Sequence, residues 1–233
     1  MSLALVAIVL VICAGAVIAV STRDSGAAAI GLAISLVAAA LLVEPLPSAA
    51  ILGVRIVAAL LVATIIRIAL RGAPRQPSPL GWPAEALLAT AGAVAGLGLA
   101  VGLSTLAVAG VPPGAPVPTL PGGPELPGSV IITTMALTVA AGTGLLAIGI
   151  APLVHGPAGA RRAIGLVLVT QAVLLIRIGI AGPSVELEEI ARAALLVVSA
   201  ATGAALAAAS ARATLGEEPD PAKPDGPRPA VAR

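Results

Sequence analysis

The chain has 233 residues, of which 58% are hydrophobic and 10% are charged, and its mean hydropathy is +1.09. A soluble domain of this length would carry far more surface charge, and the apolar runs are continuous rather than alternating, which excludes a β-barrel. The net charge is only +2, the basic residues are spread along the chain, and Trp82 is the single aromatic residue, which argues against nucleic-acid binding. The composition therefore predicts an all-α, polytopic membrane protein embedded in a lipid bilayer.

Seven apolar segments follow one another along the chain, each of about 20 residues and so long enough to cross a hydrocarbon core about 30 Å thick. Breaks at Gly, Pro and charged residues separate them. The expected spans are Leu3–Ser21, Gly26–Val43, Ser48–Leu70, Ala84–Gly110, Val130–Val154, Ala163–Gly182 and Leu187–Ala211. The Pro-rich, charged sequence after Leu215 predicts a disordered tail.

The loops between the spans alternate in charge. One set of loops has no Lys or Arg but contains Glu44, Glu125 and Glu186. The other set, with the tail, holds the basic residues Arg23, Arg71, Arg75, Arg161, Arg162, Arg212, Lys223, Arg228 and Arg233. The positive-inside rule therefore predicts an N-terminus outside and a C-terminus in the cytoplasm.

Two short sequences recur in the second half of the chain. AIGL occurs at Ala29–Leu32 and again at Ala163–Leu166, and AALLV occurs at Ala58–Val62 and again at Ala193–Val197. Either the second and third spans have a parallel repeat in the sixth and seventh, or the matches arise by chance in a chain rich in Ala and Leu.

The fourth span contains two glycine pairs at small-xxx-small spacing, Gly92/Gly96 and Gly98/Gly102. Small-residue faces of this kind let helix backbones approach closely in lipid. This face is expected either to pack inside the protein or to contact another subunit.

Three arginines fall in the outer third of the bilayer under this topology, namely Arg55, Arg177 and Arg192. An arginine at the bilayer centre costs roughly 2.5–3.5 kcal/mol, so each should snorkel to the nearer interface or pair with an outer carboxylate. Glu188 and Glu189 precede Arg192 by about one helical turn and share its face. The alternative is a buried basic cluster beside an ion path.

Thr170 and Gln171 lie roughly 11–12 Å into the sixth span, not far from the bilayer midplane. They are expected to bond across a helix interface or to line a proton wire. His155, the only histidine, lies just after the fifth span and is either solvated or a proton relay. Cys13 is the only cysteine, no Asp or Glu lies in the middle of a span, and no metal-ligand or phosphate-loop motif is present. We therefore expect no catalytic residue, cofactor or metal in this chain.

The last third of the chain carries the features of a known module. The end of the fifth span contains Gly149, and a basic loop follows at Arg161–Arg162. Gly165 opens the next helix, and the run QAVL begins at Gln171. On these features the segment Leu145–Arg212 resembles the three-helix K-type subunit of NADH-quinone oxidoreductase and the C subunit of multisubunit cation/proton antiporters.

A seven-helix chain with this unit at its C-terminus is similar to hydrogenase-4 component E. The sequence VELEEI at Val185–Ile190 resembles that family's segment before its last helix, and Arg55 falls where the family carries a basic residue. Two carboxylates of the family fall at Thr170 and near Leu195, and this chain has neither. The resemblance divides the chain into a four-helix region (1–129), a K-subunit-like three-helix region (130–212) and a disordered cytoplasmic tail (213–233).

The resemblance implies a non-catalytic membrane subunit of a complex-I-like or group 4 hydrogenase-like complex in a prokaryotic cell membrane. Its partners would be antiporter-like integral subunits and a peripheral redox arm, and the redox centres would lie on those partners. This chain would scaffold the assembly and line a proton path with Gln171, Thr170 and Arg55. Two alternatives stay open: a stand-alone transporter in which Arg55, Arg177 and Arg192 form an anion site, and a structural assembly factor.

Overall fold

The structure is a computed structural model of the chain, and it describes residues 3–22, 24–42, 48–71, 81–109, 128–155, 159–182 and 185–216. Within these ranges the chain forms seven α-helices and no β-strand. The helices are α1 (Leu3–Ser21), α2 (Ser25–Ala40), α3 (Ala49–Leu70), α4 (Trp82–Ala109), α5 (Gly128–His155), α6 (Gly159–Ala181) and α7 (Glu186–Gly216). Each helix falls on one of the seven apolar segments of the sequence.

Six of these helices are long and apolar enough to cross a membrane by length and composition. The exception is α2, a shorter apolar helix of 16 residues. It begins at an aspartate N-cap, because the Asp24 carboxylate accepts a hydrogen bond from the Ala27 N–H at 2.9 Å. Loop charges used for the sidedness prediction, including Arg23, Glu44 and Glu125, and the tail beyond Gly216 lie outside the described residues.

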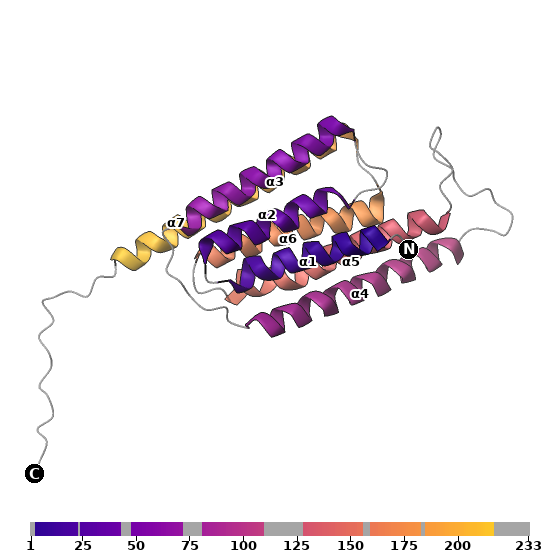
Figure 1. Cartoon of the computed structure of the whole chain (residues 1–233), viewed down its shortest axis with the longest axis horizontal. Helices are drawn as coiled ribbons and strands as arrows, with labels where there is room; N and C mark the ends of the chain where they lie inside the picture. Colours follow the sequence, from indigo (N-terminus) through magenta and orange to yellow (C-terminus); the bar gives the residue numbers. More distant parts are fainter. Residues whose placement is uncertain are drawn as a thin grey trace, which may run out of the picture.

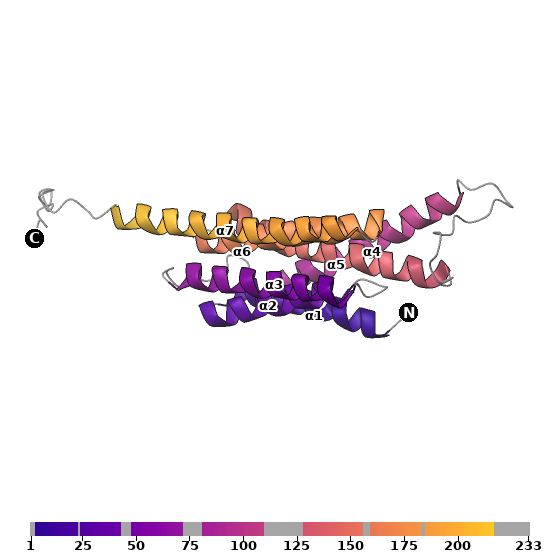
Figure 2. The ribbon, with the colours of Figure 1, turned by 90° about the horizontal axis from the view of Figure 1, so that it is seen from above.

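The helices form two layers that lie face to face. Figure 2 shows α1, α2 and α3 in one layer and α5, α6 and α7 in the other. In Figure 1, which is turned by 90°, α3 covers α7, α2 overlies α6 and α1 overlies α5, and helix contacts confirm that α1 packs on α5 and α3 on α7. The remaining helix, α4, lies along the edge of the bundle against α5 and α1.

Large apolar side chains cover the outside of the bundle as well as its interior. Leu32 and Ile66 are fully buried between helices, whereas Val57, Val94 and Val198 are at least 59% exposed on outer faces. A soluble protein would not present this much apolar surface to water, whereas lipid solvates it. The distribution is compatible with a multi-pass membrane protein.

A close glycine-to-glycine helix crossing occurs in each layer, at equivalent positions. A Cβ added at Gly31 would lie 2.7 Å from the Gly15 carbonyl oxygen, and a Cβ added at Gly165 would lie 2.7 Å from the Gly149 carbonyl oxygen. The second pair lies 134 residues after the first, which is also the separation of Arg55 and Glu189. Because Gly31 and Gly165 are the glycines of the two AIGL sequences, the recurring sequence marks the same structural feature in both layers.

The two glycine pairs of α4 have different surroundings. A Cβ at Gly92 would lie 2.8 Å from the Thr143 carbonyl oxygen, so this pair packs on α5. A Cβ at Gly98 or Gly102 would meet no atom within 4 Å. One pair is therefore used inside the protein, and the other faces outward.

We expect Gly165→Ala and Gly31→Ala each to lower the free energy of unfolding by about 1–3 kcal/mol, because the added methyl group forces two backbones apart. The matched control is Gly98→Ala, which adds the same methyl group in open space and should be neutral or slightly stabilising. Unfolding of the detergent-solubilised protein, followed by circular dichroism, measures both. Equal stability of all three variants would contradict the crossings.

Candidate functional site

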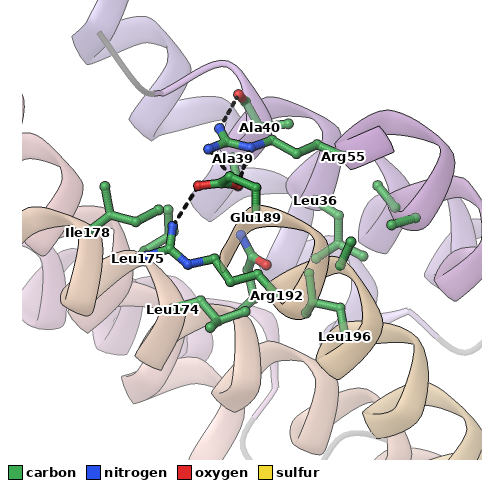
Figure 3. Close-up of a pocket in the computed structure, with 14 residues that line it drawn as sticks. Leu36, Ala39, Ala40, Arg55, Leu174, Leu175, Ile178, Glu189, Arg192 and Leu196 are labelled. Carbon is green, nitrogen blue, oxygen red and sulfur yellow. Dashed lines mark hydrogen bonds and ion pairs between the residues drawn. The ribbon is translucent and has the colours of Figure 1, made fainter. Parts of the chain in front are cut away.

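An ion pair joins the two layers near one end of the bundle. Arg55 on α3 donates from Nε to Oε2 of Glu189 on α7 at 2.8 Å, and its Nη2 lies 2.7 Å from the same oxygen. The two side chains are only 13% and 6% exposed. Arg55 also donates from Nη1 to the carbonyl oxygen of Ala40, the last residue of α2, at 3.2 Å. One guanidinium group thus connects α2, α3 and α7 (Figure 3).

Two more arginines extend this ion pair. Arg192 donates from Nη1 to Glu189 Oε1 at 3.0 Å and from Nη2 to Glu188 Oε1 at 3.1 Å. Arg177 on α6 pairs with Glu188, and both of these side chains are more exposed. We call the five residues Arg55, Arg177, Glu188, Glu189 and Arg192 the arginine–glutamate network.

The network contains all three arginines that the sequence placed in the outer third of the bilayer. Each is paired with a carboxylate, which offsets part of the cost of taking a guanidinium group out of water. The three are also clustered. The pairing with carboxylates is therefore confirmed, whereas a basic cluster beside an ion path stays a prediction.

A cavity of about 50 Å³ lies beside the network, between α2 and α3 of one layer and α6 and α7 of the other. A cavity of this size has room for a few water molecules. Gln171, Arg192, Arg55 and Glu189 supply its polar lining, and the rest is apolar (Figure 3). Two atoms of these side chains are buried and have no hydrogen-bond partner within the described part of the chain: Oε1 of Gln171 and Nε of Arg192.

The polar groups occupy one half of the bundle. Gln171 lies near the middle of α6, roughly 15 Å before its end, whereas Arg55 and Arg192 lie roughly 9 Å from the starts of α3 and α7. The other half of the interface is packed with fully buried apolar side chains, including Val167 and Leu168. The cavity and the network thus form a polar half-path from mid-helix to one end of the bundle.

Of the other two residues expected at the site, one does not line the cavity and the other has a side chain outside the described residues. Thr170 does not line the cavity, because its hydroxyl donates to the Leu166 carbonyl oxygen at 2.9 Å within α6. His155 is the last residue of α5, and its side chain lies outside the part of the chain that the structure describes. Of the six candidate residues, the structure brings together Arg55, Gln171, Arg177 and Arg192.

The start of α6 differs from the sequence prediction. The helix begins at Gly159 rather than Ala163, so Arg161 and Arg162 lie in its first turns and not in a loop. No helix-breaking residue separates Gly159 from the apolar run, and arginine is a good helix former. Arg161 is buried and donates from Nη1 to the Val20 carbonyl oxygen of α1 at 3.3 Å. The positive charge of Arg161 and Arg162 in the sequence does not indicate this contact with α1.

The pairing of Arg55 with Glu189 was also not foreseen. The sequence predicts that Arg55 snorkels or pairs with some outer carboxylate, but it names partners only for Arg192, because Arg55 and Glu189 are 134 residues apart. Their similar depth in the bilayer could have indicated the pair. Both residues follow the starts of spans that are predicted to run in the same direction, so both lie near the same side. Two side chains of opposite charge at similar depth in a bilayer tend to form an ion pair.

Comparisons with known proteins give no relative for this chain. No family model, no curated protein and no solved structure matches it. Among the described residues, no group of three His, Cys, Asp or Glu side chains is placed to hold a metal ion.

We expect Glu189→Gln to lower the free energy of unfolding by about 3–5 kcal/mol, because Arg55 and Arg192 lose the carboxylate between them. The matched control is Glu186→Gln, which makes the same change on an exposed residue of the same helical turn and should cost less than about 0.5 kcal/mol. Denaturant unfolding of the solubilised protein measures both. The double variant Arg55→Leu/Glu189→Leu should lose less free energy of unfolding than the sum of the losses in the two single leucine variants. Strictly additive losses would contradict the pairing.

Proposed function

We propose that this chain is a non-catalytic integral membrane subunit of a complex-I-like or group 4 hydrogenase-like ion-translocating complex. The observation that carries the proposal is the polar half-path, which begins at Gln171 and ends at the partly exposed Glu188. Beyond Gln171 the interface is mainly apolar, with a few buried polar side chains such as Ser35 and Arg161, and a proton cannot cross a region of this kind without a continuous chain of polar groups or water. A half-path of this kind is useful to a subunit whose neighbour supplies the other half.

Within the half-path the side chains have different tasks. The Glu189 carboxylate is engaged by Arg55 and Arg192, so its task is to hold two guanidinium groups in place and to join the layers. Gln171, whose Oε1 has no partner among the described residues, is the group left free to accept a hydrogen bond from water in the cavity. This division fits a subunit that scaffolds the assembly and lines a proton path without carrying the proton on its own midplane carboxylate.

The partners in this proposal are antiporter-like integral subunits and a peripheral redox arm, which would hold the redox centres. The outward-facing Gly98/Gly102 pair of α4 supports an integral partner, because small residues on an open helix face allow another helix to approach closely. The resemblance of α5–α7 to the K-type subunit supports the choice of complex.

The proposal includes seven crossings in a prokaryotic cell membrane, with the N-terminus outside and the C-terminus in the cytoplasm. The 16 helical residues of α2 rise roughly 24 Å, which falls somewhat short of a hydrocarbon core of about 30 Å and so requires local thinning of the bilayer. The alternation of basic loops requires α2 to cross.

We expect the chain, isolated in mild detergent from its native membrane, to co-purify with larger integral membrane proteins. Gly98→Leu should reduce the recovery of these partners several-fold, because the leucine blocks close helix approach on α4. Gly53→Leu is the matched control, since a Cβ at Gly53 on α3 also meets no atom within 4 Å. Isolation of the chain alone or as a homo-oligomer would contradict the subunit proposal.

The orientation can be tested with single cysteines in a Cys13→Ser background. A membrane-impermeant thiol reagent added to intact cells should label Ser48→Cys and Val185→Cys, which precede α3 and α7 on the proposed outer side. It should not label Arg71→Cys at the other end of α3. Labelling of Arg71→Cys alone would reverse the orientation, and unequal labelling of the first two would contradict the parallel arrangement of α3 and α7.

A second candidate function is a stand-alone small multi-pass transporter. The observation that favours it is that Arg55, Arg177 and Arg192 belong to one ion-pair network that lies beside the cavity. The detergent isolation described above separates the two candidates, because a transporter would come out without larger partners.

A further inference from the structure

We infer that the cavity between α2, α3, α6 and α7 is a binding site for a small monovalent oxyanion that carries an O–H group, of which hydrogencarbonate is the simplest example. The site is made entirely of this chain's residues. The inference therefore goes beyond the proposed subunit function and does not depend on it.

The first argument is the pair of buried atoms that lack partners in the chain. Gln171 is 8% exposed and Arg192 is 7% exposed, and both line the cavity. Gln171 Oε1 is an acceptor without a donor, and Arg192 Nε–H is a donor without an acceptor. Leaving either group buried and unpaired is costly, so a molecule that accepts from one and donates to the other would stabilise the site.

The second argument is charge. The arginine–glutamate network contains three guanidinium groups and two carboxylates, so its formal charge is +1. An excess charge in a region of low dielectric constant is unfavourable unless it is compensated. One monovalent anion bound beside Arg192 would bring the network to neutrality.

The third argument is size and position. About 50 Å³ accommodates a few non-hydrogen atoms and excludes sugars, nucleotides and amino acids with side chains. The cavity lies between the second and third helices of one layer and the equivalent helices of the other. In membrane proteins built from internal repeats, ligand sites lie at such repeat interfaces.

These constraints together select the chemistry of the ligand. An oxyanion with an O–H group accepts a hydrogen bond from Arg192 Nε and donates one to Gln171 Oε1. Chloride and formate can accept but cannot donate, so they leave the Oε1 acceptor of Gln171 without a donor. Hydrogencarbonate satisfies both groups and has few enough atoms for the cavity.

The test uses the purified full chain in detergent at mildly alkaline pH, with sodium hydrogencarbonate, sodium formate or sodium chloride at equal ionic strength. We expect hydrogencarbonate to raise the thermal midpoint of unfolding by about 2–4 °C above the value in the other two salts. An equal thermal midpoint of unfolding in all three salts would overturn the inference. That result would mean that the site holds only water or binds all three anions alike.

Variants locate the effect. Ala193→Val fills the cavity while keeping every polar side chain, and Gln171→Leu removes the unpaired acceptor, so each should abolish the hydrogencarbonate shift. Thr170→Val is the matched control, because Thr170 adjoins Gln171 on α6 but does not line the cavity, and it should retain the full shift. If Gln171→Leu does not fold, the result for Ala193→Val decides the test. A hydrogencarbonate shift that persists in Ala193→Val would contradict the proposal. Neither result bears on co-purification with larger subunits, so the two proposals fail separately.

Discussion

The contact between Arg55 and Glu189 is the interaction on which the arrangement of the two layers depends. It is almost fully buried, and it joins α3 of one layer to α7 of the other while Arg55 also reaches the end of α2. In lipid, packing two apolar helices together gains little from the hydrophobic effect, so a charged pair that can be satisfied in only one alignment specifies how the helices meet. It sets the register of α3 against α7, and with it the position of the cavity.

Glycine makes this alignment possible within each layer. The crossings Gly15/Gly31 and Gly149/Gly165 bring the first two helices of each layer into backbone contact. In a bilayer such a contact is stabilised by van der Waals attraction and weak hydrogen bonds. Because both layers use the same crossing, each presents its third helix in the same position. The third helices then face one another, and their oppositely charged residues at equivalent positions can pair.

The result is a protein whose interior carries its ion-pair network and cavity in one half, while the other half is mainly apolar apart from a few buried polar side chains such as Ser35 and Arg161. Gln171, the cavity and the arginine–glutamate network occupy the polar half. The apolar half contains fully buried Leu32, Ile66, Val167 and Leu168.

The sequence by itself determined that the chain is a set of apolar helices, because hydropathy and helix-breaking residues act locally: Leu3–Ser21 coincides with α1, and the other segments begin and end close to their helices. It also determined the pairing of Arg192 with Glu188 and Glu189, which lie one turn apart. Only the tertiary structure decided that Arg55 meets Glu189, that Gln171 rather than Thr170 lines the cavity, and that Gly92 but not Gly98 packs on α5. These depend on how helices rotate and cross, and an apolar helix offers many rotations of similar energy until a distant charge or a close backbone contact selects one.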